Sequence, residues 1–218
     1  PAKLGGLAVW AAVSLVSAVY LYFANVPDSV LPMRFLVGTF LASCVLMIEG
    51  YLDDRYDLSA KLQWVFPAVA AIIVIASGIG VGLTFISTPF GFNIPLDWNI
   101  IGVTGGAIFT WMWLMGMMYT AKILDGLDGL VAGISTIGTL TLFLLSLTDK
   151  VDQPVTATLA IIATGALLGY LVYAFHPAKI FFGDGGSLYS GFILGILSVI
   201  LGGKVATALL VMGIPILD

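Results

Sequence analysis

Charge is scarce in this sequence of 218 residues, of which 9% are Asp, Glu, Lys or Arg. A soluble domain usually carries about 25% charged residues, and it needs polar side chains to cover its core. Hydrophobic residues make up 60% of the chain, and its mean hydropathy is +1.12. The shortage of charge excludes an ordinary soluble domain and indicates a membrane protein.

Cysteine and histidine are also nearly absent, with one residue of each, Cys44 and His176. A single cysteine within an apolar run excludes an internal disulfide framework. The lone histidine favours a structural or hydrogen-bonding role over a catalytic one. The sequence begins at Pro1 and ends at Asp218 directly after an apolar run, so we interpret it as a fragment of a longer protein.

Long apolar runs, by contrast, recur along the whole chain at close to the ~20 residues that cross a bilayer. We predict seven full segments and one cut short, at 5–24, 33–51, 62–84, 100–118, 130–147, 157–175, 185–201 and 205–217. The runs are continuously apolar and do not alternate, which favours helices over barrel strands. The expected fold is all-α, a polytopic transmembrane helical bundle with about eight membrane segments.

Parity assigns each short connection to one of two faces of this bundle. Connections 52–61, 119–129 and 176–184 share a face with the N-terminus. That face carries five basic residues: Lys3, Arg55, Lys61, Lys122 and Lys179. The opposite face carries three: Arg34, Lys150 and Lys204. An excess of Lys and Arg is typical of the cytoplasmic side, so we predict that the first face is cytoplasmic.

Acidic residues form clusters on the predicted cytoplasmic face. Six aspartates lie on the predicted cytoplasmic face: Asp53, Asp54, Asp57, Asp125, Asp128 and Asp184. Only Glu49 lies inside an apolar segment. A transporter or proton channel is the alternative to an enzyme, since ionisable residues in membrane segments also mark ion paths. Transporter sites lie near the bilayer midplane, whereas acids gathered at one face favour an enzyme at the interface.

The first acidic motif is DDRYD at 53–57. Adjacent carboxylates repel one another, so a site that holds them usually needs a cation or a raised pKa. Hard oxygen ligands suit Mg²⁺ or Mn²⁺ alongside substrate phosphates. The other interpretation is a solvated helix end in which Arg55 offsets the charge.

The second motif is DGLDG at 125–129, and the third is HPAKIFFGDGGS at 176–187. Glycine beside a carboxylate lets the backbone approach a ligand closely, although a helix that ends at glycine gives the same pattern. In the third motif Lys179 is a candidate phosphate contact, Asp184 a candidate metal ligand, and Phe181 or Phe182 a candidate base-stacking ring. An interfacial aromatic belt with a glycine-rich turn is the alternative for that motif.

Together, GYLDDRYDLSAK at 50–61, ILDGLDGL at 123–130 and FHPAKIFFGDGGSL at 175–188 resemble the polyprenyl-phosphate N-acetylhexosamine-1-phosphate transferases of glycosyltransferase family 4. The order, spacing and membrane side of the motifs match, and GGL at 5–7 and PILD at 215–218 also resemble family landmarks. Asp57 stands where the muramoyl-pentapeptide branch usually has Lys. The resemblance is therefore nearer to the bacterial UDP-GlcNAc:undecaprenyl-phosphate GlcNAc-1-phosphate transferase branch.

The resemblance implies a phosphoryl transfer in which polyprenyl-phosphate oxygen attacks the β-phosphorus of a UDP-sugar and UMP leaves. It implies that Asp53 and Asp54 are the catalytic pair, and that Asp184 binds Mg²⁺, with Mn²⁺ as the alternative ion. The implied substrate-binding residues are Asp57, Lys122, Asp125, Gly126, Asp128, Lys179 and Phe181.

The resemblance further implies that residues 1–218 form one integral membrane transferase domain, whose histidine-rich loop would follow Asp218. Its partners would be the UDP-sugar, polyprenyl phosphate and the bilayer of the plasma (inner) membrane, with no nucleic acid and with a homodimer left open. The active site would face the cytoplasm. The family usually has Asn where Tyr119, Lys122 and Ala174 stand, so a catalytically weakened member is a second alternative beside an ion-coupled transporter.

Overall fold

Helices make up most of the computed structural model, which describes residues 4–87, 93–100, 102–149 and 151–201. Within these residues there are seven: α1 (Gly5–Ala24), α2 (Met33–Tyr56), α3 (Ala60–Ala76), α4 (Gly105–Leu124), α5 (Leu130–Ser146), α6 (Pro154–Ala174) and α7 (Asp184–Ile200). Two short antiparallel hairpins lie between α3 and α4: β1 (Phe85–Ser87) with β2 (Asn93–Pro95), and β3 (Asn99–Ile100) with β4 (Val103–Thr104). The predicted helical bundle is confirmed, with these hairpins as a small addition.

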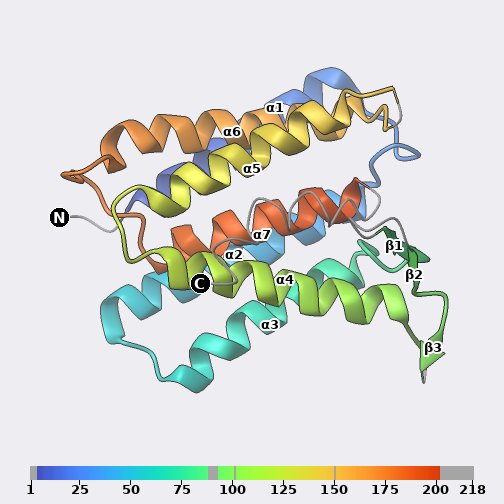
Figure 1. Ribbon diagram of the computed structural model, residues 1–218, viewed down its shortest axis with the longest axis horizontal. Coiled ribbons are helices and arrows are strands. Elements are labelled where there is room, and N and C mark those ends of the chain that lie inside the picture. The colour runs from blue at the N-terminus through green and yellow to red at the C-terminus, as the bar shows by residue number, and fades with distance from the viewer. Residues whose placement is uncertain (1–3, 88–92, 101, 150, 202–218) are drawn as a thin grey trace.

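Helix α7 forms the centre of the bundle and packs against α1, α2, α4 and α5 (Figure 1). Fourteen of its 17 residues are buried, because apolar and small side chains occupy every face. Its buried serines are satisfied locally, since the Ser187 and Ser190 hydroxyls each donate to a carbonyl three residues earlier. Trp113 of α4 also donates its indole N–H to Ser198 Oγ at 2.9 Å. These polar side chains of the core therefore have hydrogen-bond partners, as buried polar groups usually do.

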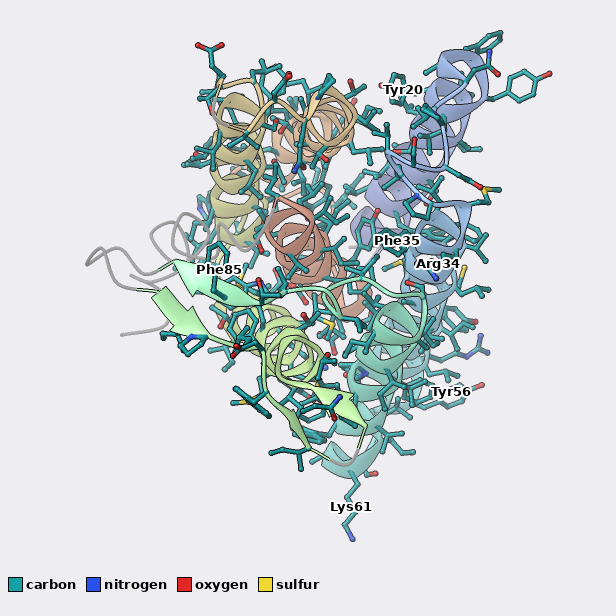
Figure 2. All side chains as sticks on the ribbon, turned by 90° about the vertical axis from the view of Figure 1, so that its right-hand side faces the viewer. Tyr20, Arg34, Phe35, Tyr56, Lys61 and Phe85 are labelled. Atoms are coloured by element: carbon teal, nitrogen blue, oxygen red, sulfur yellow. The ribbon has the colours of Figure 1, made fainter. Side chains whose placement is uncertain are left out.

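Four helices, α1, α2, α4 and α6, are long and apolar enough to cross a membrane. Helices α3, α5 and α7 are apolar but shorter. Viewed from the hairpin end, apolar side chains point outward around much of the bundle (Figure 2), and Leu15, Phe23 and Val172 are at least two-thirds exposed. Such a surface suits contact with lipid. The chain is therefore integral to a membrane, although about eight spans are not confirmed, and the predicted segment 205–217 lies outside the described residues.

The three acidic connections lie at one end of the bundle, as parity predicted. In Figure 1 the α2–α3, α4–α5 and α6–α7 connections are at the left end. The α1–α2 and α5–α6 connections and the hairpins are at the right end. Chain segments that are far apart in the sequence therefore meet at the left end.

Helices α2 and α4 continue past the apolar runs, by five and six residues, which corrects the predicted loops at 52–61 and 119–129. Asp53, Asp54 and Lys122 consequently lie on helices. Loss of hydrophobicity does not break backbone hydrogen bonding. Helix α2 ends only where Asp57 takes a left-handed conformation (φ 54°) and donates its N–H to the Asp53 carbonyl.

Helix α3 is shorter than predicted, ending at Ala76 rather than 84, and α4 begins at Gly105 rather than 100. Gly78 and Gly80 have φ values of 105° and 80°, which a helix does not accommodate. Thr104 then caps α4 by accepting a hydrogen bond from the Ala107 N–H at 3.3 Å. The hairpins occupy the segment between these two ends.

Glycines allow α1 and α2 to approach the start of α7 very closely. A Cβ on Gly50 of α2 would overlap the backbone of Gly185, and one on Gly6 of α1 would overlap Gly186. The α1 N-terminus is also held by the Gly5 and Gly6 N–H groups, which donate to the carbonyls of residues 181 and 182 at 3.1 and 2.8 Å. These contacts fix Asp184, the first residue of α7, against α2.

We expect Gly50→Ala to lower the stability of the protein by about 1–3 kcal/mol, because the added methyl group must push α2 away from α7. Thermal unfolding in detergent measures this loss. Gly169→Ala on α6 is the matched control, since its Cβ meets no atom of the described chain within 4 Å. Equal melting temperatures for the two variants would contradict the close-approach account.

Candidate active site

A lysine surrounded by three acids lies where α2, α4 and α7 meet. Lys122 Nζ is 3.0 Å from Asp53 Oδ2, 3.4 Å from Asp184 Oδ2 and 3.6 Å from Glu49 Oε1. Glu49 and Asp53 are four residues apart on α2 and therefore face the same side of that helix. We call these four residues the charge cluster.

Asp53 is held by more partners than its place in the sequence suggests. Its Oδ1 accepts hydrogen bonds from the Leu58 N–H at 2.9 Å and from Gln63 Nε2 at 2.8 Å. Tyr119 in turn donates its hydroxyl to the Gln63 carbonyl at 3.0 Å. Asp53 is buried, with a 3% exposed side chain. Sequence reasoning missed Gln63, for which the only signal was a polar residue in an apolar segment.

The carboxyl groups of Asp53 and Asp184 lie against the same ammonium group, since Lys122 Nζ contacts an oxygen of each. Acidic groups this close together repel one another unless a proton or a cation is present. Lys122 supplies the cation in this geometry.

A cavity of about 200 Å³ opens beside the charge cluster. Its lining includes six of the residues singled out from the sequence: Asp54, Asp125, Gly126, Asp128, Phe181 and Asp184. Asp184 belongs to both the cavity and the charge cluster. Tyr170 also lines the cavity and stacks on Phe182 with ring centroids 4.6 Å apart. No sequence signal pointed to Tyr170, because it lies in the middle of an apolar run.

The remaining predicted residues lie around this cavity rather than in its lining. Lys122 is 17% exposed and contacts the lining residue Asp184 at 3.4 Å. Lys179 is exposed between the lining residues Ala178 and Ile180. Asp57 is exposed at the end of α2. Asp53 does not line the cavity.

Asp128 connects the second motif to the third. Its Oδ2 accepts a hydrogen bond from the Ala178 N–H at 3.3 Å and lies 3.1 Å from His176 Nδ1. The His176 side chain is 86% exposed, so the structure gives this histidine a surface contact with Asp128. The contact holds the α6–α7 connection against the α4–α5 turn.

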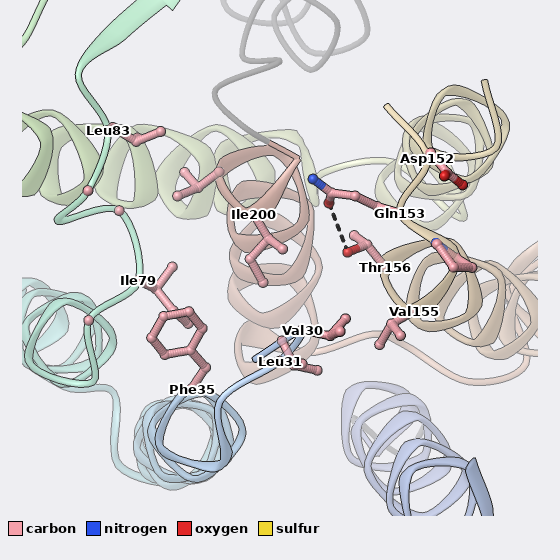
Figure 3. Close-up of a pocket in the computed structure, with 15 residues that line it drawn as sticks. Val30, Leu31, Phe35, Ile79, Leu83, Asp152, Gln153, Val155, Thr156 and Ile200 are labelled. Carbon is pink, nitrogen blue, oxygen red and sulfur yellow. Dashed lines mark hydrogen bonds between the residues drawn. The ribbon is translucent and has the colours of Figure 1, made fainter. Parts of the chain in front are cut away.

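A larger cavity of about 410 Å³ lies at the opposite end of the bundle (Figure 3). Apolar side chains such as Phe35, Ile79 and Ile200 dominate its lining, and Gln153 and Thr156 are hydrogen-bonded to each other there at 3.1 Å. None of the predicted site residues borders it. Its size alone does not make it the functional site.

The residues around Asp184 can be compared with the ligands that Mg²⁺, the ion implied by the resemblance, usually has in proteins. Among the described residues no group of three or more acids, histidines or cysteines forms a metal cage. Mg²⁺ seldom uses such a cage, since it is usually bound by one or two carboxylates together with substrate phosphates and water. Asp184, 34% exposed toward a cavity that Asp54 and Asp125 also line, fits that kind of open site.

The fold and the site define an integral membrane protein with an acidic, interfacial cavity. The family model described as Glycosyl transferase family 4 matches residues 36–202, and the chain belongs to this family. The match includes all three acidic motifs.

Three similar proteins carry related names. A probable undecaprenyl-phosphate N-acetylglucosaminyl 1-phosphate transferase of Bacillus subtilis is 32% identical, covering 99% of this chain and 57% of the relative. A decaprenyl-phosphate N-acetylglucosaminephosphotransferase of Mycobacterium tuberculosis is 29% identical over 94% of this chain and 51% of the relative. A phospho-N-acetylmuramoyl-pentapeptide-transferase of Staphylococcus epidermidis is 28% identical, over 95% and 64%. The chain spans little more than half the length of the first two.

Proposed function

We propose that this chain carries the active site of an enzyme that transfers a sugar-1-phosphate, GlcNAc-1-phosphate, from a UDP-sugar to polyprenyl phosphate and releases UMP. The convergence of three distant acidic motifs on Asp184 and its cavity carries this proposal. The names of the similar proteins support the substrate classes. Undecaprenyl phosphate is the proposed acceptor, for the synthesis of a cell-envelope polysaccharide.

The two aspartates of the first motif have different roles in this proposal. Asp54 lines the cavity and contacts the phosphate of the lipid acceptor, whose oxygen attacks the β-phosphorus of the donor. Asp53 accepts hydrogen bonds from three partners, the Leu58 N–H, Gln63 and Lys122, and does not line the cavity. It therefore acts by holding Lys122 in position beside Asp184.

Asp184 is the proposed ligand of Mg²⁺, or of Mn²⁺ in its place. A divalent ion bound there supplies positive charge to the diphosphate and to the leaving UMP. Gly183 has a φ of 77°, and the absence of a side chain there leaves the cavity side of Asp184 open to a phosphate. The second motif, with Asp125, Gly126 and Asp128, would lie along the nucleotide.

Phe181 is the proposed stacking partner of the uracil ring, which is supported by its position in the cavity lining and its 39% exposure. Lys179, two residues earlier and exposed, is the proposed phosphate contact at the rim. Both residues belong to the α6–α7 connection that Asp128 holds in place. We propose that this end of the bundle faces the cytoplasm, at the inner membrane, where UDP-sugars are available.

The transporter alternative loses its support, because the charge cluster lies at one end of the bundle, beside the 200 Å³ cavity. The chain's family membership also favours a transferase. A catalytically weakened member would share this fold and would show no transfer in the assay below.

The proposal is tested with the purified complete protein in detergent, given labelled UDP-GlcNAc and undecaprenyl phosphate. We expect Mg²⁺-dependent label in the organic extract, lost on addition of EDTA and restored by excess Mg²⁺. Absence of lipid-linked label over a range of Mg²⁺ and Mn²⁺ concentrations would contradict it.

Donor preference is a separate prediction, motivated by Asp57. This exposed carboxylate at the end of α2 stands where the muramoyl-pentapeptide branch usually has Lys. We expect UMP release to be at least about tenfold faster with UDP-GlcNAc than with the muramoyl-pentapeptide nucleotide, the scale of one lost polar contact. The reverse preference would assign the chain to the other branch.

A further inference from the structure

Lys122 is the only cation within ionic contact of Glu49, Asp53 and Asp184 among the described residues. Its Nζ lies 3.0–3.6 Å from one oxygen of each acid, and its side chain is 17% exposed. It does not line the neighbouring cavity. Its position is therefore that of a counter-charge for the protein's own acids.

Glu49 explains why a lysine is held at this place. Its side chain is fully buried, and within the described part of the chain neither carboxylate oxygen has a hydrogen-bond partner. A buried carboxylate without a partner is strongly unfavourable, and Lys122 is the cation within reach. Because Glu49 and Asp53 lie one turn apart on α2, the ammonium is fixed between them.

The position of this ammonium bears directly on metal binding at Asp184. Lys122 Nζ already contacts Asp184 Oδ2. A divalent ion on the same carboxylate would lie within a few ångströms of a positive charge. At such separations the repulsion is substantial even in a medium with the dielectric constant of water.

We propose that Lys122 is a built-in cation of the active site, a positioning residue that holds Asp53 and Asp184 and weakens divalent-ion binding at Asp184. Glu49 is the acid that retains Lys122 in this role. The inference rests on the proposed function, because it takes Asp184 as the metal ligand. It goes further because it makes Glu49 and Lys122 depend on each other. With an uncharged side chain at position 122, no such pair would form.

The test compares Mn²⁺ binding, followed by electron paramagnetic resonance without substrate, in variants of the complete protein. We expect Lys122→Asn to bind Mn²⁺ about tenfold more tightly than wild type, the scale of removing one nearby unit charge. Lys61→Asn is the matched control, since Lys61 is an exposed lysine in the first turn of α3, beside the α2–α3 connection at the same end of the bundle (Figure 1), and it should leave the affinity unchanged.

Stability supplies the second measurement. Lys122→Asn leaves Glu49 buried without a cation, so its melting temperature should fall. The double variant Glu49→Gln/Lys122→Asn should recover most of that loss, because both charges are gone. If Lys122→Asn does not fold, the double variant is compared with Glu49→Gln, and the same tightening of Mn²⁺ binding is expected.

Unchanged or weaker Mn²⁺ binding on removal of Lys122 would overturn the inference, as would a double variant no more stable than Lys122→Asn. These outcomes are independent of the transfer assay. Tighter Mn²⁺ binding without any GlcNAc-1-phosphate transfer would reject the proposed function alone. Transfer without a change in Mn²⁺ affinity would reject the role of Lys122 alone.

Discussion

Asp184→Asn should lower the rate of sugar-phosphate transfer by at least about 100-fold, while the protein stays folded. The reason is the loss of a metal-binding charge, since metal stabilisation of a phosphoryl transition state is worth several kcal/mol. Lipid-linked label formed per minute, measured across a Mg²⁺ titration, checks the prediction. Circular dichroism and elution volume check the fold.

A capping role for Asp184 is not an adequate explanation of its position. The residue that precedes α7 as its N-cap is Gly183, and Asp184 is the first helical residue. Its carboxyl group contacts Lys122, which also contacts Asp53. Asp28→Asn is the matched control, an acid at the other end of the bundle that accepts a hydrogen bond from the Met33 N–H at 3.2 Å. Near-normal transfer by Asp184→Asn would exclude it as an essential metal ligand.

Alanine at Asp53 and at Asp54 should produce losses of different kinds. Asp53→Ala removes a buried acceptor that Lys122, Gln63 and the Leu58 N–H share, so it should lower stability by roughly 3 kcal/mol and also abolish transfer. Asp54 lines the cavity and is less buried than Asp53, so Asp54→Ala should abolish transfer with a smaller change in stability. The two measurements are thermal unfolding and lipid-linked label.

The difference between these two variants tests the separate roles of Asp53 and Asp54. Adjacent residues of one motif would be expected to behave alike if both contacted substrate equally. Equal losses of stability for Asp53→Ala and Asp54→Ala would contradict the assignment of a positioning role to Asp53. Retained transfer by Asp54→Ala would show that Asp54 is not a catalytic residue.

The end of the bundle that holds the site was predictable because membrane topology follows from counting apolar runs. Asp53, Asp125 and Asp184 are far apart in the sequence, and parity alone placed them together. The contacts among them were not predictable. Helix α2 had to continue to Tyr56, and α4 to Leu124, before Lys122 reached Asp53. Hydropathy does not report where such polar helix ends stop.

The contact between Glu49 and Lys122 was not predictable from the sequence either. The sequence marked Glu49 as an acid inside a membrane segment and Lys122 as a substitution of the usual Asn. Pairing the two requires the packing of α2, α4 and α7, which the close approach of Gly50 to Gly185 permits. The roles of Gln63 and Tyr170 depend on that packing as well.

The identity of the leaving nucleotide tests the central claim most directly. If the complete protein transfers a sugar-1-phosphate, each molecule of UDP-GlcNAc consumed with undecaprenyl phosphate yields one UMP, and mass spectrometry finds a lipid diphosphate. A transferase that moved the sugar alone would release UDP and form a lipid monophosphate. UMP with the diphosphate product is the predicted result, and UDP with the monophosphate product would contradict the account.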